Sequence, residues 1–246
     1  MSKKHDQPPG NHDRRGWLLA GVTLVYAAAV LGVDILATLG VQVPIDWTFF
    51  RWTAWEGPLI ATGGRPPFMR AMGVDLFKFF AWFAIPFLIC LPWMDWRFLG
   101  WKRWRRIDAV FMAIAFFVGL GAVSLIAFVP GLRDFYPSLA GAETADKVRF
   151  VVHMLAWTFS WLLGWEFLHR YVLLRVLDRP MPRWGWLLIP LYEGVYHLVK
   201  HPLEAVGMVL ASVLLTAWTR NSRNVALPFL AHLIIEVQLI LFMVLV

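Results

Sequence analysis

Three ionisable side chains lie within five residues of one another inside a long apolar run. Glu166, His169 and Arg170 belong to the segment WEFLHRY, residues 165–171. Charged groups at membrane depth are costly, and they usually pair with one another and mark a functional site. Glu166 and Arg170 are four residues apart, so they share one face of a helix. The segment therefore predicts a polar site whose partners come from elsewhere in the chain.

Two later segments carry the candidate partners. They contain, in chain order, Glu193, His197, Lys200 and Glu204, then His232 and Glu236. A carboxylate and an imidazole can deprotonate a water, and a second imidazole can stabilise an oxyanion that forms when the water attacks. We expect Glu166 with His197 to activate the water, and His232, oriented by Glu236, to stabilise the oxyanion.

The other polar residues of these segments are assigned supporting roles. Arg170 is expected to keep Glu166 ionised. Lys200 and Glu204 are expected to line the substrate pocket or to orient His197, and Glu193 is assigned to the same pocket. Taken singly, each motif has a structural interpretation, such as a buried ion pair between Glu166 and Arg170. Their coincidence favours an active or formerly active site.

The chain around these segments has the composition of a membrane protein. Of its 246 residues, 59% are hydrophobic and 16% are charged, whereas about a quarter of the residues in soluble domains are charged. Several apolar runs approach the length that crosses hydrocarbon. The predicted fold class is all-α, a polytopic transmembrane helical bundle of about seven membrane spans. The formal charge of +7 is assigned to basic loops that contact membrane lipids, and no nucleic acid is expected as a partner.

Seven apolar segments are predicted to span the membrane: residues 17–40, 76–94, 108–130, 150–177, 184–200, 203–219 and 226–246. Residues 1–16 are expected to form a disordered cytoplasmic tail, and residues 41–75 an interfacial loop. Asp34, inside the first span, is either an interface residue or a buried partner.

The basic loops alternate along the chain. Residues 95–107, 178–184 and 220–225 have an excess of Lys and Arg. The positive-inside rule then places these loops and the N-terminus in the cytoplasm. We expect an integral protein of a prokaryotic inner (plasma) membrane. Counted from the cytoplasmic helix ends at about 1.5 Å per residue, Glu166, His197 and Glu236 all lie roughly 20 Å deep.

The three polar segments resemble the motifs of the CAAX protease and bacteriocin-processing (CPBP) family of intramembrane proteases, which includes the type II CAAX prenyl endopeptidases. That family carries Glu-Glu-x-x-x-Arg, a second motif ending in His, and His-x-x-x-Asn. Residues 165–170 fit the first motif with Trp165 in the leading position, His197 fits the second, and residues 232–236 fit the third with Glu236 for Asn. The resemblance covers residues 150–246, which leaves residues 17–149 as N-terminal transmembrane helices.

The resemblance implies an intramembrane endopeptidase that hydrolyses a membrane-associated peptide or protein, prenylated or otherwise lipidated, with a Glu/His-activated water and no cofactor. A zinc ion held by His197, His232 and a glutamate is the alternative. The family's proposed base is the glutamate at the position of Trp165. Either Glu166 replaces it, or Glu193 supplies the carboxylate, or the chain is a catalytically inactive scaffold that binds a partner. A transporter is a third class, but no inverted repeat supports it.

Overall fold

The computed structural model describes residues 11–39, 74–101, 104–133, 135–136 and 138–246. The elements in these ranges are all helices, six of them long and apolar enough to cross a membrane, so the predicted polytopic helical bundle is confirmed. Residues 1–10 of the expected tail and residues 40–73 of the expected interfacial loop lie outside the described residues. Helix α1 already begins at Asn11.

The longer helices follow the predicted spans closely. They are α1 (Asn11–Thr38), the Leu76–Trp93 span with α2 (Leu76–Lys78) and α3 (Ile85–Cys90), α5 (Arg106–Ser124), the Thr144–Leu177 span with α7 (Thr144–Glu166) and α8 (Leu174–Leu177), α10 (Pro202–Ser222) and α11 (Ala226–Leu245). Two short helices, α4 (Trp96–Leu99) and α6 (Pro130–Arg133), lie in connections.

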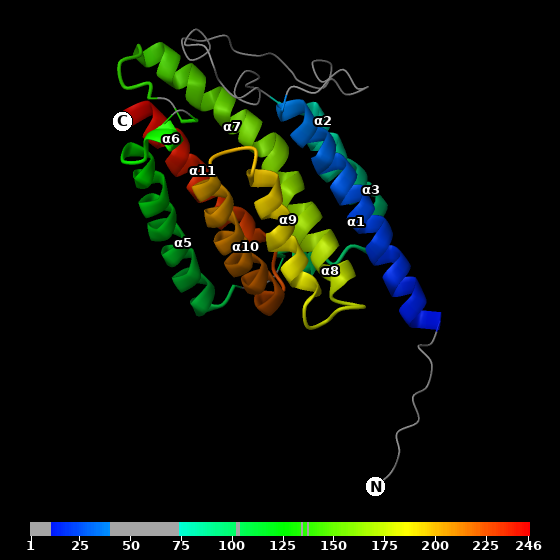
Figure 1. Ribbon diagram of the computed structural model, residues 1–246. Helices are drawn as coiled ribbons and strands as arrows, with labels where there is room; N and C mark the ends of the chain where they lie inside the picture. The colour runs from blue at the N-terminus through cyan, green and yellow to red at the C-terminus, as the bar shows by residue number, and fades with distance from the viewer. Residues whose placement is uncertain (1–10, 40–73, 102–103, 134, 137) are drawn as a thin grey trace.

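The fifth predicted span, residues 184–200, is shorter than expected. Its helix α9 covers only Leu188–His197, ten residues, which is about 15 Å and half the thickness of the hydrocarbon core. Pro202 disfavours helical backbone at the residue before it, and His201 is extended there at φ −70°, ψ 137°. The chain therefore turns early, and α9 lies beside α10 as a helical hairpin (Figure 1).

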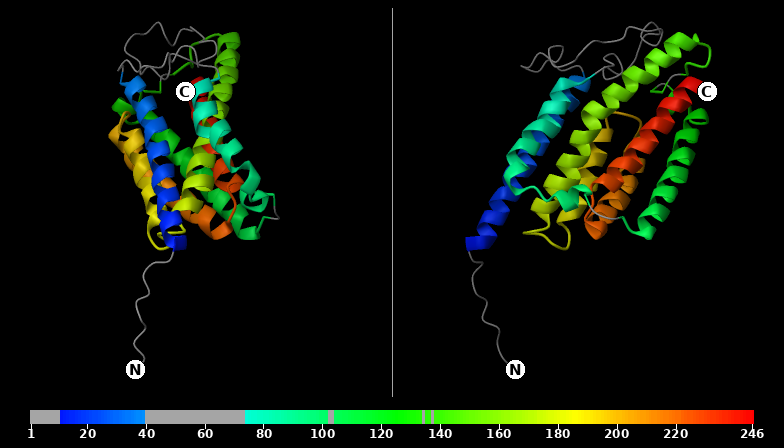
Figure 2. Two further views of the ribbon diagram at one scale, coloured as in Figure 1. Left: turned by 90° about the vertical axis from the view of Figure 1, so that its right-hand side faces the viewer. Right: turned by 180° about the vertical axis from the view of Figure 1, so that it is seen from behind.

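Helix α7 runs through the centre of the bundle. It contacts α11 on one side and the π-helical segment Phe79–Ala84 of the second span on the other, while α11 packs against α5. Helix α1 lies along α8. The start of α1 and the C-terminal end of α11 are at opposite ends of the bundle, and the start of α1 shares its end with α8 (Figures 1 and 2).

A buried ion pair joins the first two spans to α9. Lys78 Nζ lies 3.2 Å from Asp34 Oδ2, and both side chains are at most 4% exposed. The Tyr196 hydroxyl donates a hydrogen bond to the same Asp34 oxygen, and the Lys78 ammonium lies 5.0 Å from the centre of the Trp82 ring. Asp34 is therefore a buried partner, not an interface residue.

The close approach of α7 to the second span depends on Gly164. A Cβ at this position would lie 2.5 Å from the Cβ of Trp82 and 2.9 Å from its backbone carbon. We expect Gly164→Ala to lower the free energy of unfolding by about 1–3 kcal/mol, because the two backbones would have to separate. Gly121→Ala, whose Cβ would meet no atom within 4 Å, should be neutral or slightly stabilising. Unfolding curves in detergent measure both, and equal effects would contradict this reason.

Candidate active site

The first polar segment lies where the long central helix changes its winding. The α-helix ends at Glu166, and residues Phe167–Leu173 form a π-helical segment before α8. Short π segments are rare and occur frequently at functional sites. Glu166, His169 and Arg170 are all at most 1% exposed. The segment therefore turns its ionisable groups into the protein rather than toward lipid.

Arg170 bridges two carboxylates from different helices. Its Nη1 lies 2.8 Å from Glu166 Oε1 and its Nη2 3.1 Å from Glu193 Oε2 on α9. Nη2 also lies 3.5 Å from the Ser212 hydroxyl on α10. A guanidinium suits this role because its donors are spread over a rigid plane. The ion pair fixes α7, α9 and α10 relative to one another around the site.

His232 on α11 binds the same glutamate. Its Nδ1 lies 2.8 Å from Glu166 Oε1, so the N–H on Nδ1 donates to the carboxylate. In the neutral imidazole this leaves Nε2 with a free lone pair. Nε2 lies 3.8 Å from Glu236 Oε1, so the second ring nitrogen is directed toward another carboxylate.

His197 on α9 has a parallel arrangement. Its Nδ1 donates to the backbone oxygen of Glu193 at 2.9 Å, and its Nε2 lies 4.0 Å from Glu204 Oε1. The side chains of His197 and His232 are 9% and 7% exposed, against 1% for Glu166. Both histidines thus have one anchored nitrogen and one nitrogen directed toward a carboxylate, and they are more accessible than the ion pair behind them.

A second ionic group supports Glu204. Lys200 Nζ lies 2.6 Å from Glu204 Oε1, and the Tyr136 hydroxyl donates to Glu204 Oε2 at 2.8 Å. Burial raises the pKa of the Tyr136 phenol, so this hydroxyl stays protonated and remains a donor. The carboxylate of Glu204 is held facing His197.

An apolar hollow of about 170 Å³ reaches Glu166. Aromatic and aliphatic side chains from four parts of the chain line it, among them Phe83, Leu99, Phe167 and Phe229. Glu166 Oε2 is buried and forms no hydrogen bond with a described residue. The site therefore combines a charged carboxylate with an apolar cavity beside it.

The structure places the eight candidate residues in two neighbouring groups, but the expected pair of Glu166 with His197 does not form. Glu166 contacts His232 and Arg170 and has neither a hydrogen bond nor an ion pair with His197. Glu193, proposed as a pocket residue or a substitute base, forms an ion pair with Arg170.

Three further residues complete the site. Ser212 and Tyr136 gave no signal in the sequence, because one is a small polar residue in an apolar helix and the other lies in a charge-balanced connection. Trp165 is 1% exposed, and its ring centre lies 5.0 Å from that of Tyr196 and 5.7 Å from that of His197. An indole thus fills the position of the motif's leading glutamate.

The donors proposed for zinc do not converge. Within the part of the chain that the structure describes, no three His, Cys, Asp or Glu side chains are placed to share a metal ion. The described side chains therefore do not fit the zinc site proposed from the sequence.

Comparison with protein-family models matches residues 147–237 to one family, the Type II CAAX prenyl endopeptidase Rce1-like proteins. The matched range contains the motif helix, α9, α10 and most of α11. No curated protein and no solved structure matches the chain.

Proposed function

We propose that this chain, whose residues 147–237 form a type II CAAX prenyl endopeptidase Rce1-like domain, hydrolyses a membrane-associated peptide that carries a prenyl or other lipid group. The family consists of intramembrane peptidases. The observation that carries the proposal is the contact between His232 and Glu166, 2.8 Å long and backed by Arg170.

In the proposed mechanism His232 is the general base. Its Nε2 accepts a proton from a water, and the hydroxide attacks the peptide carbonyl. Glu166 stabilises the imidazolium that forms and holds the ring in the required tautomer, as the carboxylate of a catalytic triad does. His232 then returns the proton to the leaving amine, so that the peptide bond breaks and one water is consumed.

The remaining groups act on His197 and on the substrate. Glu204, held by Lys200 and Tyr136, lies 4.0 Å from His197 Nε2 and would stabilise a proton that His197 takes up during the reaction. The Nε2–H of the protonated ring donates to the oxyanion. The apolar hollow beside Glu166 receives the lipid group or an apolar side chain of the substrate. This assignment exchanges the roles that the sequence suggested for the two histidines.

The test is cleavage by the full chain reconstituted in vesicles. The probes are an internally quenched peptide with a farnesylated cysteine and the same peptide without the farnesyl group. We expect the farnesylated peptide to have a kcat/KM at least tenfold higher, because each buried CH₂ contributes about 0.8 kcal/mol. Equal rates would exclude a lipid-binding role of the hollow, and cleavage of neither peptide would argue against the peptidase assignment.

Trp165 supports a second candidate function. A tryptophan that replaces the motif's leading glutamate and packs on His197 is what a catalytically inactive scaffold would retain for stability. Such a protein would bind a membrane partner without cleaving it. Inactivity toward both peptides, together with retention of one of them by the vesicles, would favour this function.

We further propose that the end of the bundle where α1 begins faces the cytoplasm. The basic loops that follow α8 and α10 lie at the same end (Figure 1). By the positive-inside rule this end is cytoplasmic, and a prokaryotic inner membrane fits such an arrangement.

A further inference from the structure

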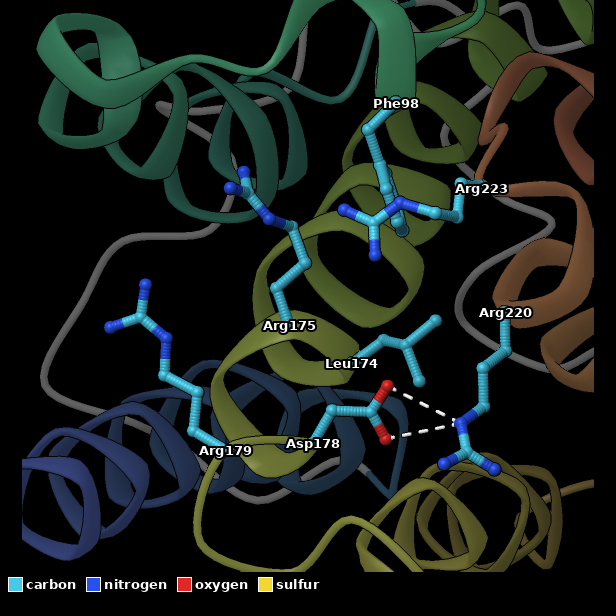
Figure 3. A pocket seen from close by; sticks show the side chains of 7 residues that line it. All are labelled: Phe98, Leu174, Arg175, Asp178, Arg179, Arg220 and Arg223. Atoms are coloured by element: carbon cyan, nitrogen blue, oxygen red, sulfur yellow. Dashed lines mark hydrogen bonds and ion pairs between the residues drawn. The ribbon is translucent and has the colours of Figure 1, made fainter. Parts of the chain in front are cut away.

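Four arginines surround a second hollow, at the end of the bundle where α1 begins. The hollow has a volume of about 260 Å³. Arg175 and Arg179 extend from α8 and the residues after it, while Arg220 and Arg223 come from the end of α10 (Figure 3). Asp178 is about 18 Å along the helix from Glu166, so this hollow is separate from the candidate active site.

The charges around the hollow are unbalanced. Its lining holds one carboxylate, Asp178, which pairs with Arg220 at 3.3 Å. Nη2 of Arg223 lies 3.8 Å from Oδ2 of Asp95, a residue that does not line the hollow. Arg175 and Arg179 have no ion pair with any residue whose position is described. The four arginines line one hollow, and their like charges repel one another unless an anion bound there offsets them.

Phe98 holds two of the arginines in place. The guanidinium carbons of Arg175 and Arg223 lie 5.7 and 5.3 Å from the centre of its ring. The backbone N–H of Val225 donates to the Phe98 oxygen at 2.8 Å. Gly100, at φ 119°, lets α4 approach α11 so closely that a Cβ there would lie 2.5 Å from the Cβ of Ala226. The hollow is therefore built on fixed backbone.

Arg223 has a disfavoured backbone conformation. It is the one non-glycine residue with positive φ in the described ranges, at φ 50°, ψ 50°. Glycine is preferred at this position after a helix because side chains strain the left-handed conformation. Strained residues often lie at binding sites. Keeping an arginine here gives the hollow a fourth guanidinium at the expense of local stability.

We propose that this hollow binds a phosphate group, and specifically that of an anionic phospholipid headgroup. Guanidinium groups bind phosphate oxygens through paired hydrogen bonds. The hollow lies at the ends of the spans, and Trp101 and Trp184 nearby in the chain are 77% and 70% exposed, as expected for side chains at headgroup level. A soluble phosphate offers the same chemistry, so the test separates the two sources.

The experiment measures thermal unfolding of the full chain in maltoside detergent. The added probes are dioctanoyl phosphatidylglycerol, dioctanoyl phosphatidylcholine and inorganic phosphate. We expect phosphatidylglycerol to raise the Tm saturably and phosphatidylcholine to have little effect. An affinity for phosphatidylglycerol at least tenfold above that for inorganic phosphate identifies a lipid site, whereas equal affinities identify a site for soluble phosphate.

Variants decide whether the hollow is the site. Arg175→Gln and Arg223→Gly should each weaken the apparent affinity roughly tenfold, the effect of one lost charged hydrogen bond. Arg223→Gly should also raise the Tm without ligand, because it relieves the strain, so weaker binding cannot be attributed to unfolding. Arg183→Gln removes a charge outside the hollow and should change the affinity less than twofold. No saturable shift with either anion, or an equal loss in Arg183→Gln, would overturn the proposal.

Discussion

Glu166→Gln is expected to lower kcat/KM for the farnesylated peptide by about 10²–10⁴-fold, the range that general acid–base catalysis contributes. The amide oxygen of glutamine can still accept the Nδ1–H of His232, so the position of the ring is kept. What is lost is the negative charge, 2.8 Å from His232 Nδ1, that stabilises the imidazolium after the proton transfer. The measurement is cleavage by reconstituted vesicles under conditions of single turnover.

The matched control is Glu143→Gln. Glu143 is exposed and precedes the other end of the same helix, so the substitution removes the same charge without touching the site. We expect activity within twofold of the unmodified chain. Full activity of Glu166→Gln would refute both the role of Glu166 and the wider use of this site for hydrolysis.

Arg170→Met is expected to have the largest effect on stability. It leaves the carboxylates of Glu166 and Glu193, which are 1% and 0% exposed, without their shared cation. Removal of one partner from a buried ion pair typically lowers the free energy of unfolding by about 3–5 kcal/mol. Unfolding by denaturant in detergent micelles would measure the difference.

Two further variants separate charge from packing. Glu166→Gln and Glu193→Gln, added to Arg170→Met, should restore part of the lost stability, because the two amides carry no unpaired charge. Arg149→Met is the control, since Arg149 is 56% exposed and its pair with Asp146 is 4.0 Å long. An exposed pair of this kind contributes at most about 1 kcal/mol. If Arg149→Met destabilises as much as Arg170→Met, the buried bridge has no special role.

The bundle could be predicted because membrane spans have a strong signal. A run of apolar residues near the thickness of hydrocarbon leaves few alternatives to a helix. The length of α9 was the exception. The span predicted from hydropathy ended at Lys200, but His201-Pro202 and the turn before it limit the helix to Leu188–His197. Hydropathy reports which residues prefer lipid and not where the backbone turns.

Which residues belong to the candidate site could be predicted better than which of them contact one another. The spacing of four residues placed Glu166 and Arg170 on one face of a helix, where the structure pairs them. Which histidine meets Glu166 depends instead on how α7, α9 and α11 are rotated about their axes. The π-helical segment Phe167–Leu173 changes that rotation, and no residue in it predicts a change in helical winding. The role of Tyr136 likewise depends on a connection that reaches α10 only in the folded chain.

The ion pair of Asp34 with Lys78 affects whether residues 147–237, the segment that matches the family model, could be moved into another protein. Residues 147–237 include Tyr196, whose hydroxyl is bound to Asp34 of α1, and Trp165, which packs on Trp82 of the second span. A fragment cut at the boundaries of the matched segment would contain Tyr196 and Trp165 but lack their partners Asp34 and Trp82. A chimaera with another membrane protein therefore has to include the first two spans, or supply other residues that contact Tyr196 and Trp165 next to His197.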